Sequence, residues 1–183
     1  MLSETANLPP SVDLDELVHL FYEQTESLGA FERCESNEMP DAYRTLLAHH
    51  EHMTVTVESF HNSLVDVRVH RTDLNDELYA REITLHRQTD GAVVQYGIVR
   101  LNSEYLEREV WEEIASQKIP LGRVLIEHDV LREVVLEKLW RVSCNQPLAD
   151  MLGVKPNATV FGRTAMIFCN KEPAIELLEI VVV

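Results

Sequence analysis

The sequence is poor in cysteine and in basic residues, and it lacks any long apolar run. Its three cysteines (Cys34, Cys144 and Cys169) are widely spaced and form no CxxC pair, so neither a disulfide framework nor a cysteine-based metal site is indicated. No segment approaches the roughly 18 apolar residues that a membrane helix needs. The acidic start has no apolar stretch of the kind found in signal peptides. These absences favour a cytoplasmic protein with reduced core thiols.

Acidic residues outnumber basic ones, 31 to 16, which gives a formal net charge of −15 over 183 residues. A surface of that charge repels phosphate backbones and anionic lipids, so neither nucleic acid nor membrane is expected as a partner. A small anionic ligand would need its own buried basic group. The composition, 45% hydrophobic and 26% charged, is that of a globular chain long enough for a real core.

The order of elements predicts an α+β fold. Residues 1–12 read as a flexible N-terminal arm and 13–183 as a single domain. Apolar residues at helical spacing predict helices after Asp13, from Pro40, over 103–116 and in "QPLADMLGV". "PLGRVL" reads as a proline stop, a glycine turn and a short apolar run. Alternation predicts strands in "MTVTVESF", "LVDVRVH", "YAREITLH", "AVVQYGIVRL", "REVVLEKLWRVS", "TVFGRTAMIFC" and "AIELLEIVVV". We therefore expect a single antiparallel sheet of about six strands with helices packed on one side.

Two charged residues fall on the apolar side of their strands. In "YAREITLHRQ" Arg81 shares the odd face with the apolar residues Tyr79, Ile83 and Leu85, and in "AIELLEIVVV" Glu179 interrupts an apolar run. An inward charge is costly unless it is paired or binds something. The two residues could form a structural ion pair, or one could lie at the rim of the sheet. Alternatively, they line a pocket in which arginine grips a carboxylate and glutamate serves a hydroxyl or a proton.

Several segments of the chain resemble the chorismate lyase family. The likeness covers roughly residues 43 to 182 and rests on "LL" and "HMT" around Met53, "REITL", "IPLGRVL", and "FGR" followed by a last hairpin ending "LLEIV". The family has a single antiparallel sheet with helices against one side. Its aromatic site is buried under flaps and uses neither a metal nor an organic cofactor. By this resemblance the chain removes pyruvate from chorismate to give 4-hydroxybenzoate, a step in ubiquinone or plastoquinone synthesis.

The resemblance also implies roles for four residues. Arg81 takes the position that binds the ring carboxylate, and Met53 lies on the flap whose backbone meets the same carboxylate. Leu121 contributes backbone polar atoms near the ring hydroxyl. Glu179 matches the glutamate near that hydroxyl. Chorismate carries its own driving force towards an aromatic ring, so the protein need only orient it and assist one proton transfer.

The chain departs from the compact lyases in two ways. Ile98 stands where they tend to carry an arginine, so Arg100 or Arg163 would have to act as a second cation, although either could be a surface charge. The stretch "PLADMLGV…ATVFGRTAMIF" also resembles UTRA-type effector-binding domains of bacterial regulators, which bind small ligands without chemistry. Because the residues before the likeness are acidic, a DNA-binding role is not expected. The alternative function is non-catalytic binding of a small aromatic acid.

Three further features have plainer interpretations. His49 and His52 could share a helix face, but no third ligand is indicated and the HExxH spacing is absent, so we expect no metal. Cys169 lies in an apolar segment and is interpreted as a core thiol. Trp111 and Trp140 are interpreted as packing residues.

Overall fold

The computed structural model describes residues 11–75 and 78–183, and these form an α+β fold with one antiparallel sheet. The sheet order is β1-β5-β6-β7-β4-β3-β2. The fold class predicted from the sequence is thus confirmed, with seven strands in the described part where about six were expected. The strands are β1 (Gly29–Cys34), β2 (Val65–Asn75), β3 (Leu78–Arg87), β4 (Val93–Asn102), β5 (Arg132–Cys144), β6 (Thr159–Cys169) and β7 (Glu172–Val181).

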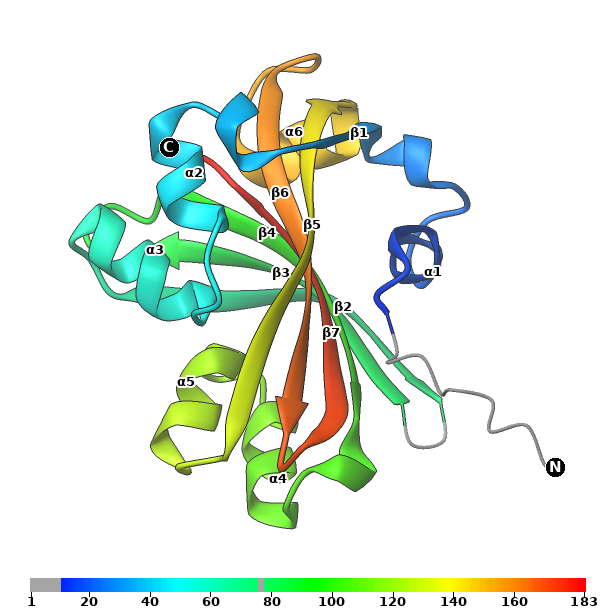
Figure 1. Ribbon diagram of the computed structural model, residues 1–183, viewed down its shortest axis with the longest axis vertical. Coiled ribbons are helices and arrows are strands. Elements are labelled where there is room, and N and C mark those ends of the chain that lie inside the picture. Colours follow the sequence, from blue (N-terminus) through cyan, green and yellow to red (C-terminus); the bar gives the residue numbers. More distant parts are fainter. Residues whose placement is uncertain (1–10, 76–77) are drawn as a thin grey trace, which may run out of the picture.

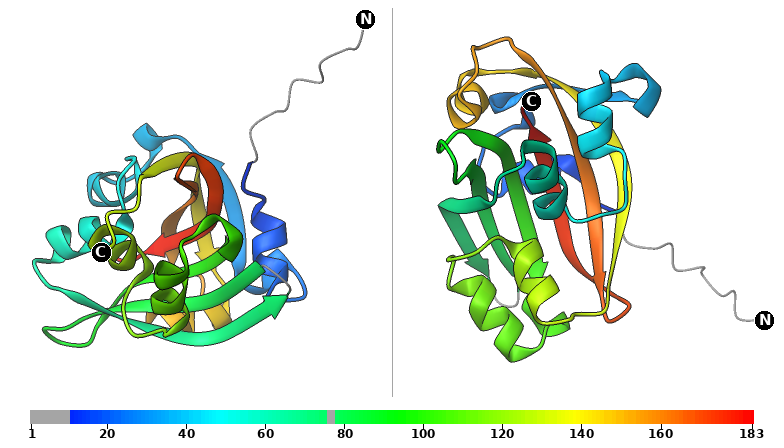
Figure 2. Two further views of the ribbon diagram at one scale, coloured as in Figure 1. Left: turned by 90° about the horizontal axis from the view of Figure 1, so that it is seen from below. Right: turned by 90° about the vertical axis from the view of Figure 1, so that its left-hand side faces the viewer.

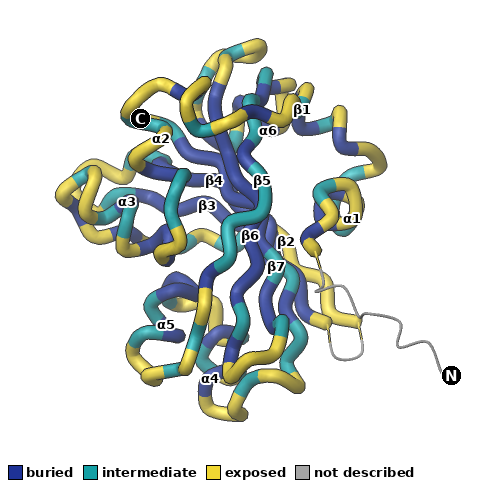
Figure 3. The backbone as a smooth tube through the Cα atoms, in the orientation of Figure 1, coloured by how far each residue is buried: buried dark blue, intermediate teal, exposed yellow. Residues whose placement is uncertain are grey.

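Helices lie on both faces of the twisted sheet (Figure 1). They are α1 (Leu14–His19), α2 (Asp41–Leu47), α3 (Met53–His61), α4 (Arg108–Ala115), α5 (Leu121–Glu127) and α6 (Gln146–Leu152). Helices α2 to α5 cover the face that carries Arg81, and the right-hand view of Figure 2 looks towards this side. Helices α1 and α6 pack on the opposite face, so the expectation of helices on one side holds for only four of the six. The reason is that the central strands are apolar on both sides, and each side needs cover (Figure 3).

Two segments form helices where the sequence predicts other structures. "MTVTVESF" is helix α3 instead of a strand, and "LGRVL" belongs to helix α5 instead of following a turn. The alternation in α3 was misleading because Met53 and Val57, four residues apart, also share a helix face, and both are buried. β-branched residues lower helix propensity only slightly, so packing of this face decides the structure.

Strand β1 was not predicted, because only its two ends are buried and its sequence does not alternate. It pairs with β5 at the edge of the sheet, where Gly29 lies opposite Cys144. A Cβ at Gly29 would lie 2.3 Å from the Ser143 carbonyl oxygen, so only glycine permits this close pairing.

Most of the expected N-terminal arm, residues 1–10, lies outside the described residues. Val12, at its end, is buried in the core beside α1, and its N–H donates to Glu137 Oε2 at 2.7 Å. The packed structure therefore includes at least one residue assigned to the arm. No helix in the described part is long and apolar enough to cross a membrane.

Candidate functional site

The register of the central strands places the predicted site residues on one face, in three neighbouring rows. Directly paired residues in antiparallel strands share a face, and rows two residues apart are separated by roughly 6.7 Å. Gly97, in the middle row, has no side chain, and the Ile83 side chain lies 3.5 Å from where its Cβ would stand. The first row is Arg81, Val99 and Leu177, the second is Ile83, Gly97, Glu179 and Arg163, and the third is Leu85, Gln95 and Val181.

A cavity lies over these rows, and all four residues expected at the site line it: Arg81, Glu179, Met53 and Leu121. Its other lining side chains are mostly aliphatic, and they come from β2, β3, β4, β5, β6 and β7. The space open to the centre of a water molecule is about 40 Å³. One water needs roughly 10–15 Å³ by this measure, so a ring-sized ligand requires the helices over the cavity to move outwards.

Arg81 is a buried cation without an acidic partner among the described residues. Its residue exposure is 1%, and within the described part its guanidinium donates a long hydrogen bond of 3.4 Å to the Ile114 carbonyl and interacts with the Tyr79 hydroxyl. The Nε atom is buried and has no partner there. Burial lowers the pKa of the guanidinium, an effect that the nearby Tyr79 hydroxyl opposes. A charge in this state is poised to receive an anion.

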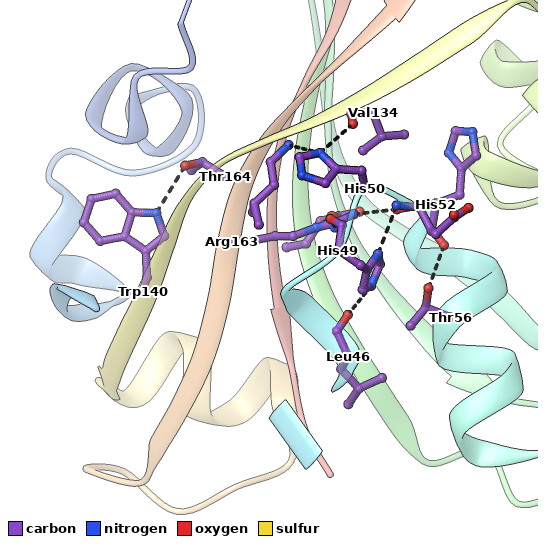
Figure 4. A network of polar contacts seen from close by, with 12 residues as sticks. Leu46, His49, His50, His52, Thr56, Val134, Trp140, Arg163 and Thr164 are labelled. Carbon is purple, nitrogen blue, oxygen red and sulfur yellow. Dashed lines mark hydrogen bonds and ion pairs between the residues drawn. The ribbon is translucent and has the colours of Figure 1, made fainter. Parts of the chain in front are cut away.

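Glu179 does not pair with Arg81, as one interpretation of the sequence proposed, but with Arg163. Arg163 Nε donates to Glu179 Oε2 at 2.7 Å, and both side chains are almost fully buried. The remaining guanidinium nitrogens donate to the carbonyls of His49 and Glu51, at 2.9 and 3.0 Å (Figure 4). Arg163 is therefore not a hairpin surface charge. Its hydrogen bonds hold the 49–52 loop over the site, and each of its three guanidinium nitrogens has a partner.

The cover of the cavity is built from the N-terminal ends of α3 and α5. The first-turn N–H groups of a helix have no intrahelical acceptor, and no side chain caps α3. Met53 begins α3 and Leu121 begins α5, and both residues line the cavity. The two ends are in close contact, because a Cβ added to Gly122 would lie 2.9 Å from Thr54 Oγ1. The positive end of the α3 dipole adds to the attraction for an anion.

The histidine-rich loop before α3 is structural. His52 is buried and accepts a 2.7 Å hydrogen bond from Arg132 Nε, while burial, together with Arg132 and Arg163, lowers its pKa to about 4. His49 Nε2 lies 2.6 Å from the Leu46 carbonyl (Figure 4). The two imidazoles thus have separate partners in a loop instead of sharing a helix face. Among the described residues, no three histidine, cysteine or acidic side chains could hold a metal.

The cavity carries more positive than negative charge, although the chain as a whole is strongly acidic. Arg81 and Arg163 contribute two guanidiniums and Glu179 one carboxylate, while the low pKa of His52 keeps it neutral near pH 7. An acidic surface repels anionic polymers, whereas the cavity itself carries a net positive charge.

The other candidates have no role at this cavity. Arg100 pairs with Glu176 and Glu16, and Ile98 is fully buried on the opposite face of the sheet. Cys169 is buried, which raises its pKa to about 11 and makes it an inert thiol. Trp111 packs edge-on against Tyr79, and Trp140 packs similarly against Phe31, so both tryptophans are packing residues as predicted.

A further buried charge, Glu82, was not predicted from the sequence, because it lies on the polar side of the alternation in β3. Glu82 is fully buried and accepts hydrogen bonds from Tyr22, Tyr96 and Arg71. Burial raises its pKa, but these bonds outweigh that effect and lower it overall. Glu82 therefore has three hydrogen-bond donors, one of them a cation, whereas Arg81, on the other face of β3, has no acidic partner among the described residues.

The fold is similar to that of known effector domains. No family model matches the sequence, and no curated protein matches it. The effector domain of PhnF from Mycobacterium smegmatis is 12% identical, with a TM-score of 0.53 over 72% of this chain and 87% of that domain. The longer PhnF structure is 11% identical, with a TM-score of 0.52 over 71% of this chain. The possible regulator YydK from Bacillus subtilis gives 12% and 0.48 over 66% of this chain.

The two PhnF comparisons establish the fold and no more, because identity is low. The chain spans 63% of the longer PhnF structure and 59% of YydK. The likeness supports the UTRA-like part of the family expectation and does not single out chorismate lyase.

Proposed function

We propose that this chain binds a small organic acid, of the size of a hydroxybenzoate, in the cavity under α3 and α5. The observation that carries the proposal is Arg81. This arginine is buried in a cavity without an acidic partner in the described part of the chain. Desolvating a cation without a counter-ion costs stability, and a ligand carboxylate would supply the missing charge and hydrogen bonds.

The surrounding groups suit such a ligand. A carboxylate on the Arg81 guanidinium would form charge-assisted, potentially bidentate hydrogen bonds. Aliphatic side chains of Val99, Leu177 and Ile83 line the adjoining space, which favours an apolar body on the acid. Because the free cavity is small, binding is coupled to outward movement of α3 and α5, and this slows association relative to an open site.

The second candidate function is the lyase reaction on chorismate, and it rests on Glu179 lying in the same cavity as Arg81. In that reaction the bond between ring carbon and ether oxygen breaks, and the enolpyruvyl group leaves to become pyruvate. The neighbouring ring carbon, which carries the hydroxyl, loses its hydrogen as a proton, and this completes the aromatic ring of 4-hydroxybenzoate. The departing enolpyruvate takes up one proton at its methylene carbon to become pyruvate, so the protons balance. Glu179, held by Arg163, would receive the ring proton or orient the hydroxyl.

Calorimetric titration with 4-hydroxybenzoate and benzoate tests the binding proposal. Arg81→Met should weaken binding by about 2–4 kcal/mol, roughly 30-fold or more, because the carboxylate loses a buried charge-assisted contact. Arg100→Met is the matched control, since it removes a guanidinium from the same sheet outside the cavity. Equal affinity of Arg81→Met and the parent would refute the site.

Incubation with chorismate separates the two functions. Release of pyruvate and 4-hydroxybenzoate, lost in Glu179→Gln, would establish the lyase. Binding of 4-hydroxybenzoate without any turnover of chorismate would establish the domain as a binding protein.

A further inference from the structure

Gln95 is the second polar group at this cavity that lacks a partner. Its exposure is 3%, it lines the cavity, and its Oε1 is buried without a hydrogen bond from any described residue. A buried amide oxygen without a donor weakens folding, so most such groups find partners. Neither the alternation of β4 nor the family resemblance pointed to this residue.

The neighbours of Gln95 within the sheet cannot satisfy it. It pairs across the strands with Leu85 and Val181, which are apolar. The nearest polar row of the same face holds Glu179 and Arg163, and these two residues bind each other. Gln95 Oε1 is thus a buried acceptor without a donor among its neighbours in the sheet, and it lines the cavity.

Arg81 and Gln95 lie on either side of the middle row, which holds Ile83, Gly97, Glu179 and Arg163. Gln95 is paired with Leu85, four residues beyond Arg81 on β3, so roughly 13 Å of strand separates the two positions. Both side chains line the cavity between them. One small molecule in that space would meet a cation at one end and a hydrogen-bond acceptor at the other.

We propose that Gln95 determines specificity, by accepting a hydrogen bond from a hydroxyl or amino group at the end of the ligand remote from its carboxylate. The inference rests on the proposed function and narrows the ligand to acids that carry such a donor. An acid without the donor leaves Oε1 desolvated and unpaired, and so binds more weakly. Discrimination therefore comes from the added hydrogen bond, because Oε1 is already unpaired in the free protein.

The test is an affinity ratio measured by calorimetry for 3- and 4-hydroxybenzoate against benzoate, with 4-methylbenzoate as a control for size. The parent should bind one hydroxybenzoate about tenfold or more tightly than benzoate, and the methyl analogue should gain no such preference. Gln95→Met keeps the length of the side chain and should bring the ratio to about one. Gln88→Met, which removes an exposed amide bonded to Asp66, should keep the ratio of the parent.

A second measurement does not depend on ligand. Gln95→Met should unfold at a higher urea concentration than the parent, because it removes a buried unpaired oxygen. A lower midpoint would mean that Gln95 has a structural partner, and it would overturn the inference. Equal binding of all four acids by the parent would overturn it while leaving the proposed function standing. Failure of every acid to bind would overturn both.

Discussion

At the scale of single residues, the site is defined by charges and polar groups that folding leaves unsatisfied. Arg81 and Gln95 each have a buried polar atom without a partner in the described residues, whereas Glu82, one residue from Arg81, has three. Native proteins retain such unpaired buried groups at sites where a bound ligand supplies the missing partner. Stability and binding should therefore respond in opposite directions to substitutions at these positions.

Arg81→Met should raise the free energy of unfolding of the ligand-free protein by about 1–3 kcal/mol, because a buried cation without a counter-ion is replaced by an apolar chain. Urea denaturation measures this change. Arg100→Met should do the reverse, since Arg100 is paired with Glu176 and Glu16. A clear loss of stability in Arg81→Met would indicate that Arg81 is paired with an anionic group in the ligand-free protein, and this would contradict the proposed site.

The buried His52 should make stability depend on pH. Its pKa is about 4 in the folded protein and about 6.5 when unfolded, so only the unfolded chain takes up this proton between those values. The free energy of unfolding should consequently fall as pH drops from 6.5 towards 4, by up to ~3 kcal/mol from this residue. His52→Gln should flatten that part of the profile, and His19→Gln, at the surface, controls for removal of an imidazole. An unchanged slope in His52→Gln would contradict the assignment.

Sequence alone located Arg81 and Glu179 because a charge that breaks an apolar alternation is visible. It did not locate Gln95, because an uncharged polar residue in a strand does not by itself indicate a site. The sequence also did not predict that Arg163 pairs with Glu179, because the two are 16 residues apart and only the β6–β7 register brings them together.

At the scale of elements, the contact between α3 and α5 is the least predictable part of the site. Both helices are short, and a period-two pattern in α3 concealed a buried helical face. The strands that carry the polar rows are long and rich in β-branched and apolar residues, so they were predicted well. The cover of the cavity depends on tertiary packing, which local sequence does not encode.

Gly122→Ala tests the close approach of the two helix ends. The added Cβ would lie 2.9 Å from Thr54 Oγ1, so the variant should lose about 1–3 kcal/mol of stability despite the better helix propensity of alanine. Adding Thr54→Ala should recover part of that loss by removing the hydroxyl, as a double-mutant cycle in urea would measure. Full additivity of the two substitutions would show that the residues do not press on each other.

At the scale of the whole molecule, one sheet forms the floor of the cavity and supports the helices that cover it. The same sheet borders the hydrophobic core on its opposite face. Because three hydrophobic clusters share this sheet, we propose that residues 13–183 form a single domain. It should then unfold in one transition when followed by near- and far-ultraviolet circular dichroism. The acidic surface repels anionic polymers, whereas the cavity carries a net positive charge.

The central claim is that Arg81 binds the carboxylate of a small acid, and a crystal structure with 4-hydroxybenzoate tests it most directly. In that complex we expect the carboxylate oxygens at about 2.7–2.9 Å from the Arg81 guanidinium, with α3 and α5 moved outwards to admit the ring. A ligand bound elsewhere, or an Arg81 paired with an acidic side chain of the protein itself, would contradict it.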